Sequence, residues 1–207
     1  MKIKFPISDH FDGRKFFNTS SVKTKSLKDL LRWQLSKQRK KWPKQVKNLS
    51  VPSPHHALGP TTVVATFINH ASYLLQFQKT NILIDPVFSD RVSPLQSLGP
   101  KRIRPPGISI EQLPSIDGIL LTHNHYDHMD LPALKILKNK FDPIFIMPLG
   151  NKKYLSSLGI QKIHELDWWQ SAKVNELEVT LTEAQHWSAR TLWDHFTSLW
   201  GGFYINN

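Results

Sequence analysis

The chain has 207 residues, of which 27 are Lys or Arg, 16 are Asp or Glu and none is Cys. The absence of cysteine excludes disulfide bonds and thiolate metal sites, so any metal ion must be held by imidazole and carboxylate groups. A hydrophobic content of 40% is enough for a packed core and excludes a wholly disordered chain.

The net charge of +11 lies entirely in the first part of the chain. Residues 1–60 hold 14 basic and 3 acidic residues, whereas residues 61–207 hold equal numbers of both. We therefore divide the chain into a basic leader, residues 1–60, and a neutral body, residues 61–207. A domain that binds nucleic acid would be basic as a whole, so we expect no nucleic-acid partner.

Residues 26–41 of the basic leader are predicted to form an amphipathic helix with Ser26 as its N-cap. Its leucines fall on one stripe, formed by Leu27, Leu30, Leu31 and Leu35. Two interpretations are open: the helix lies on an anionic membrane with Trp33 and Trp42 at the interface, or its leucine stripe packs on the body. A proline-spaced, irregular linker is expected from there to residue 60.

No apolar run approaches the roughly 18 residues that span a membrane, and residues 1–10 lack the apolar region of a secretory signal. We therefore expect a cytoplasmic protein, which associates with membranes if the first interpretation of the leader helix holds.

The body is predicted to contain short strands followed by alternating strands and helices. Strands are expected at 63–68, 73–77, 81–84, 118–122, 144–147, 162–166, 176–183 and 199–205, and helices at 131–140 and 151–158. Residues 86–114 are rich in Pro and Gly and are expected to form a long loop. This order predicts an α/β or α+β fold in which helices cover a sheet.

One segment of the body concentrates metal-ligating residues. His123, His125, Asp127 and His128 follow directly on the apolar run 118–122. In extended chain, residues i and i+2 face the same side, so His123 and His125 can bind one metal ion. Asp127 and His128 enter the turn before a helix and suit a second ion ~3.5–4 Å away. This set suits zinc, with Mn, Fe and Ni as alternatives; a metal-free surface loop and a single structural metal are the competing interpretations.

These residues resemble the signature of the metallo-β-lactamase-fold hydrolases. The segments Asn69-His70-Ala71-Ser72 and Ala184-Gln185-His186-Trp187 resemble one subgroup, the N-acylphosphatidylethanolamine-hydrolysing phospholipase D and its bacterial relatives. The resemblance extends over the leader, including Phe16-Phe17-Asn18. It implies an αββα sandwich of two similar halves, of which this chain supplies the first half and the start of the second.

The resemblance also implies roles for individual side chains. His123, His125 and His186 would bind a first zinc ion, and Asp127 and His128 a second one. As the catalytic residue, Asp127 would orient a metal-bound hydroxide or accept its proton.

Two further acidic residues are expected to support the ligands. Asp85 follows the apolar run 82–84, and its alternative role is that of a turn residue at a strand end. Asp130 precedes the helix at 131, and its alternative role is that of an N-cap. His70 is expected to be structural or to line a pocket.

The function implied by the resemblance is that of a zinc-dependent hydrolase attacking a phospholipid phosphodiester, with other esters and phosphodiesters as further substrate classes. Two ligands of the family, an Asp that bridges both metals and a late His, have no match after His186. We therefore expect a truncated chain with one zinc ion instead of two, and the alternative function is a metal-binding remnant with little or no activity. An uncovered face of the first sheet would then favour self-association.

Overall fold

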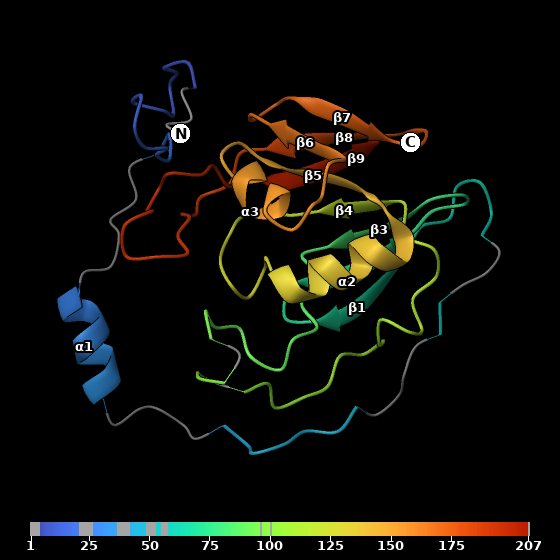
Figure 1. Cartoon of the computed structure of the whole chain (residues 1–207), viewed down its shortest axis with the longest axis horizontal. Coiled ribbons are helices and arrows are strands. Elements are labelled where there is room, and N and C mark those ends of the chain that lie inside the picture. Colours follow the sequence, from blue (N-terminus) through green and yellow to red (C-terminus); the bar gives the residue numbers. More distant parts are fainter. Residues whose placement is uncertain are drawn as a thin grey trace.

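The computed structural model describes residues 5–20, 27–36, 42–48, 53–54, 58–95, 97–99 and 101–206. Within them, two β-sheets stack on each other and two helices cover the outer face of the larger sheet (Figure 1). The helices are α1 (Leu27–Leu35), α2 (Leu131–Phe141) and α3 (Lys152–Ser156). The strands are β1 (Val64–Asn69), β2 (Ser72–Gln76), β3 (Asn81–Ile84), β4 (Gly118–Leu120), β5 (Ile144–Pro148), β6 (Ile163–Leu166), β7 (Ser171–Val174), β8 (Leu177–Thr182) and β9 (Gly202–Asn206).

The larger sheet has the strand order β1-β2-β3-β4-β5-β6. β1, β2 and β3 are antiparallel neighbours, whereas β3, β4, β5 and β6 run parallel. Ile84 at the end of β3 and Leu120 at the end of β4 are in register. Because parallel strands end at the same edge of a sheet, the segments that follow β3 and β4 emerge side by side.

Side chains of the larger sheet point alternately into two cores. Leu83, Ile119 and Phe145 pack with residues of α2 and α3 in the first core. Ile82, Leu120 and Ile146 pack in the second core, with residues of the smaller sheet. Burial on both faces explains why these central strands are short, continuous apolar runs. The three layers, helices then sheet then sheet, confirm the predicted fold class.

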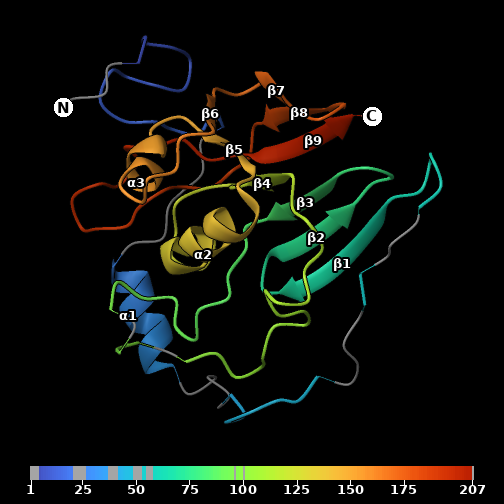
Figure 2. The same ribbon diagram turned by 45° about the vertical axis from the view of Figure 1, so that its right-hand side comes forward.

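The smaller sheet consists of β7, β8 and β9 in antiparallel order, and it lies against the larger sheet in both ribbon views (Figure 2). The approach is close, since a Cβ on Gly118 would lie 2.9 Å from the side chain of Val174. The smaller sheet thus covers the central strands of this face, where Ile82, Leu120 and Ile146 are buried, and the expectation of an uncovered face is wrong there. Phe67 of β1 and Tyr73 of β2 remain 48% and 38% exposed, and self-association stays a prediction.

Most of the predicted strands and both helices of the body are present, with ends shifted by a few residues. β7 was not predicted. β9 begins at Gly202 and not at 199, because the preceding residues cross toward the larger sheet, where the amide of Gly201 donates to the carbonyl of Thr122 at 3.0 Å. The described part of 86–114 contains no helix or named strand, as expected.

The basic leader contacts the body through its first described residues. Phe11 and Phe16 are buried in the second core. By contrast, α1 lies outside the two-sheet body (Figures 1 and 2), and Leu31, Trp33 and Leu35 are exposed. The packed interpretation of the leucine stripe is therefore wrong for Leu31 and Leu35.

Other predictions about the leader fall outside the described residues, among them Ser26 and the expected helical residues 37–41. The boundary at residue 60 remains a prediction. No helix in the described part of the chain is long and apolar enough to cross a bilayer.

Candidate metal centre

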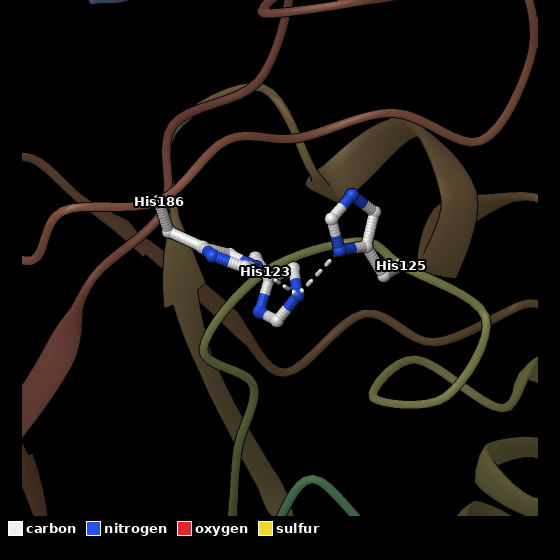
Figure 3. Close-up of side chains that lie close together, drawn as sticks. All are labelled: His123, His125 and His186. Atoms are coloured by element: carbon white, nitrogen blue, oxygen red, sulfur yellow. Dashed lines mark hydrogen bonds between the residues drawn. The ribbon is translucent and has the colours of Figure 1, made fainter. Parts of the chain in front are cut away.

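Three histidine rings converge at the edge where β4 ends (Figure 3). His123 and His125 lie in the segment after β4, and His186 lies after β8. The Nε2 atom of His123 lies 2.9 Å from Nδ1 of His125 and 3.0 Å from Nε2 of His186. The structure thus brings together the three residues assigned to the first ion, although His186 is 61 residues further along the chain than His125.

Hydrogen bonds through Asp85 and Thr122 orient His123. The Thr122 amide donates to Oδ1 of Asp85 at 2.7 Å, and the Thr122 hydroxyl donates to Oδ2 at 2.6 Å. Having given its one proton to Asp85, this hydroxyl accepts from Nδ1 of His123 at 2.9 Å. The lone pair of His123 is therefore on Nε2, the atom that faces the other two rings.

A second group of candidate metal ligands lies directly beside the three histidines. These two sets are called the first and the second donor group below. The rings of His123 and His128 are 4.0 Å apart between centroids. Nδ1 of His128 donates to Oδ2 of Asp85 at 2.7 Å, and Nε2 of His70 lies 3.1 Å from Oδ2 of Asp127. One donor atom each from His70, Asp127 and His128 lies within 4.8 Å of the others. His70, expected to be structural or to line a pocket, is therefore part of this group.

Burial keeps the first group of imidazoles unprotonated. It lowers the pKa of His123 far below its usual value and that of His125 to about 4, and the neighbouring rings add to both effects. Partial burial, followed by the charge of His128, also lowers the pKa of His186. For His128, burial opposes the charged form, but the hydrogen bond and charge of Asp85 outweigh it and raise the pKa.

The first group fits a metal ion. Two nitrogens bound tetrahedrally to one zinc ion, each at 2.0–2.1 Å, lie about 3.3 Å apart, close to the separations of 2.9 and 3.0 Å between these ring nitrogens. Three neutral imidazoles without a thiolate form a set that zinc accepts, and other first-row divalent metals bind such sets too.

Asp130 fixes the backbone near the site. Among the described residues, it makes no hydrogen bond to the histidine rings. Its carboxylate accepts from the amides of Ala133, Phe88 and Ser89 at 3.2, 2.9 and 2.7 Å. It is the N-cap of α2, and it also ties the segment that follows β3 to the start of this helix.

Arg190 stabilises the loop that carries the ligands, a role that sequence reasoning missed. Its guanidinium donates to the carbonyls of Asn124 and Met129, both at 2.9 Å, and lies 4.1 Å from the ring centroid of Tyr126. Both ends of the turn containing Asp127 and His128 are thereby fixed. A single arginine in an irregular segment carries no signal for this role in the sequence.

Asn18 of the basic leader fixes His186. Its side-chain amide donates to the carbonyl of His186 at 3.0 Å and accepts from the amide of His186 at 3.1 Å. The sequence contained a signal for this residue, the resemblance of Phe16-Phe17-Asn18, but no role could be assigned to it.

The metal-free protein is expected to lose stability as the pH falls from 7 toward 5. Unfolded imidazoles bind protons near pH 6.5, whereas His123 and His125 in the folded chain bind them only at lower pH, so acidification favours the unfolded chain. His128 has the opposite effect on stability, because its pKa is raised in the folded chain. Its contribution to the unfolding free energy is fully present below about pH 6.5, the pKa of an unfolded histidine, and is lost as the pH rises through its pKa in the folded chain.

Urea unfolding in the presence of a chelator, at pH 7 and pH 5, measures this effect. We expect a lower midpoint at pH 5 and a smaller decrease for His125→Gln. A midpoint that stays constant or rises at pH 5 would contradict the burial of neutral imidazoles.

Comparison with known proteins identifies the family of the chain. Residues 80–207 match the family described as beta-lactamase superfamily domain. The mitochondrial N-acyl-phosphatidylethanolamine-hydrolyzing phospholipase D of Saccharomyces cerevisiae is 38% identical over 149 residues, which are 70% of this chain and 32% of the yeast protein. The N-acyl-phosphatidylethanolamine-hydrolyzing phospholipase D 1 of Caenorhabditis elegans is 35% identical over 170 residues, 77% of this chain and 47% of the worm protein.

The chain thus matches less than half of the length of either curated relative. Among solved structures, Igni18, a metallo hydrolase of Ignicoccus hospitalis, has a TM-score of 0.52 and 23% identity over 70% of this chain and 56% of its own. This likeness shows a shared fold. From the family match and the two stacked sheets, we conclude that the chain belongs to the beta-lactamase superfamily.

Proposed function

We propose that the chain is the ligand-bearing part of a zinc-dependent hydrolase that cleaves phospholipid phosphodiesters, as the names of the yeast and worm relatives suggest. The observation that carries the proposal is the convergence of the His123, His125 and His186 nitrogens beside Asp127. The relatives are more than twice as long as the matched segment. Their activity is therefore a proposal for this chain, which contributes the candidate metal ligands to it.

A cleft of about 670 Å³ beside the second donor group suits a lipid substrate. Its walls contain His70, Asp127 and the basic residues Lys101 and Arg104. Much of the remaining lining is apolar, namely Trp42, Pro43, Val46, Phe67, Val87, Val92 and Ile103, and the rest is Asn69, Ser89, Asp90 and Arg102. Asp90 forms an ion pair with Lys101 at 3.1 Å. An apolar cleft with cations and candidate metal ligands matches a molecule that joins acyl chains to a phosphodiester.

The basic leader forms one wall of this cleft. The amide of Val46 donates to the carbonyl of Ile103 at 2.7 Å, and the side chain of Asn48 donates to the carbonyl of Pro106 at 3.0 Å. Residues 42–48 are thus fixed against the long loop of the body. A substrate in the cleft would contact both the leader and the body.

In this proposal, His123, His125 and His186 hold the first zinc ion. When bound, zinc supplies Lewis acidity and lowers the pKa of water from 15.7 toward about 7. Asp127, in the turn that follows His125, accepts a proton from the attacking water. Arg190 and Asn18 keep the ligand-bearing segments in place through the hydrogen bonds described above.

The exposed side chains of α1 favour contact with a membrane. Trp33 and Leu35 are 57% and 83% exposed, and Trp42, which follows the helix, is 82% exposed. Apolar and aromatic groups within a basic segment bind anionic lipid surfaces. We propose a cytoplasmic protein whose leader binds a membrane peripherally, which would bring the cleft to its substrate.

Vesicles containing N-acylphosphatidylethanolamine test the proposal. The zinc-loaded chain is expected to release phosphatidic acid, detected by mass spectrometry, and to lose this activity when zinc is chelated. The same vesicles, sedimented at low and high salt, report leader binding, which should weaken at high salt. Vesicles without anionic lipid serve as the control.

The alternative is a metal-binding remnant without catalysis. Tight zinc binding with no product above the level of the chelated protein would favour it over the hydrolase. Product that does not depend on zinc would contradict both candidates.

A further inference from the structure

The backbone conformation of His70 is set by a tight turn. The residue lies in the short turn between β1 and β2 with φ of +43°, in the left-handed region. Histidine is among the non-glycine residues enriched in that region, and such positions are often found at functional sites. The register between β1 and β2 is also irregular just before His70, between Phe67 and Asn69.

The conformation directs the His70 ring toward Asp127. Nε2 of His70 lies 3.1 Å from Oδ2 of Asp127, and the rings of His70 and His128 make an edge-to-face contact with centroids 5.3 Å apart. In His128, Nδ1 is already bonded to Asp85. This bond leaves Nε2 as the atom of His128 that is free to bind a metal.

The contact between His70 and Asp127 lies at the protein surface. Their side chains are 55% and 42% exposed, so an ion pair between them would add little to folding stability. The contact does hold a ring nitrogen and a carboxylate oxygen side by side at the cleft, in position to share one ion.

We propose that His70 is the third protein ligand of a second zinc site, which it forms with Asp127 and His128. The separation of 3.1 Å between its Nε2 and Oδ2 of Asp127 suits two ligands of one ion, each about 2.0–2.2 Å from the metal. The inference rests on the proposed function, in which the first zinc ion lies next to this site. It also replaces the sequence-based expectation of one zinc ion per chain.

The second site would be open to the cleft. His70 and Asp127 both line it, whereas His128 is mostly buried, with a side-chain exposure of 17%. Three protein ligands leave a fourth position for a water molecule or a substrate oxygen, as in catalytic zinc sites. His70 would therefore link substrate binding in the cleft to the metal centre.

Zinc stoichiometry tests the assignment without using activity. The stripped full chain is titrated with zinc by calorimetry, and bound metal is counted by atomic emission after dialysis. We expect two ions for the original chain and one for His70→Asn, whose second site should be at least 10-fold weaker. Asparagine is used because it tolerates the left-handed conformation, and circular dichroism verifies that the variant is folded.

His164→Ala is the matched control, because His164 is exposed on β6 and belongs to neither donor group. It should bind two ions like the original chain. Two ions of unchanged affinity in His70→Asn, or a single ion in the original chain, would overturn the role of His70 and leave the first site intact. An original chain that binds no zinc would instead overturn the proposed function.

Discussion

Replacing His123 with alanine is expected to abolish the stabilisation that zinc gives through the first site, formed by His123, His125 and His186. Nε2 of His123 is the common neighbour of the facing nitrogens of His125 and His186, so its removal leaves two ligands without their central partner. At a zinc concentration 100 times the dissociation constant, binding should add about 2.7 kcal/mol to the unfolding free energy of the original chain. The variant should lose this contribution and keep only what zinc adds at the second site, formed by His70, Asp127 and His128.

Urea unfolding with and without zinc gives both values in one set of measurements. Without zinc, the variant should also be less stable, because it loses the hydrogen bonds of the buried His123 ring to Thr122, His125 and His186, each worth about 0.5–1.5 kcal/mol. His164→Ala should respond to zinc as the original chain does. A His123→Ala chain that zinc still stabilises fully would show that the ion binds elsewhere.

Local sequence pattern was sufficient to predict which side chains after β4 the structure brings together. An apolar run that ends in alternating histidines specifies both a buried strand and the side to which His123 and His125 point. The following Asp127 and His128 were placed correctly next to them, because a turn must separate β4 from the helix that Asp130 caps. These features depend on near neighbours in the chain.

Contacts between distant segments could not be predicted in the same way. Asn18 and Arg190 act through backbone atoms of His186, Asn124 and Met129, and a backbone carbonyl has no residue-type signature. His70 contacts Asp127 across 57 positions of the sequence. Such partners become visible only when the strand order brings the segments together.

The missed and shifted elements have similar causes. β7 has the sequence Ser171-Ala-Lys-Val174. It alternates between polar and apolar residues, but it is only four residues long and contains a single β-branched residue, so its strand signal is weak. The leucine stripe of α1 was compatible with either packing or a membrane surface, since periodicity identifies an apolar face but not what covers it.

Replacing Asp85 with asparagine should weaken zinc binding at both sites by about 10–100-fold, the usual effect of removing a group that orients metal ligands. The Asp85 carboxylate accepts from the amide and hydroxyl of Thr122 and from Nδ1 of His128. An asparagine side chain has a single acceptor oxygen and would direct an N–H group at one of these donors. Either His128 or the Thr122 bond that orients His123 would then be lost.

Asparagine is the informative replacement because Asp85 has a φ of +41°, a conformation that asparagine also tolerates. The backbone turn should therefore persist while the hydrogen bonding changes. Leaving a buried donor without a partner costs about 1–3 kcal/mol, so the metal-free variant should unfold at lower urea concentration. Removal of the carboxylate should also lower the pKa of His128, which Asp85 raises, and NMR titration of the metal-free protein measures this change.

Asp130→Asn is the control, because Asp130 is equally buried and caps α2 but has no hydrogen bond to a candidate ligand among the described residues. It should lower stability by about 1–3 kcal/mol, because asparagine can still cap the helix but lacks one of the two carboxylate oxygens that accept from Phe88, Ser89 and Ala133. Zinc affinity should stay almost unchanged. Equal losses of zinc affinity in the two variants would assign the effect to general loosening of the segment. A selective loss in Asp85→Asn requires that this one carboxylate, through Thr122 and His128, orients the histidines of both donor groups.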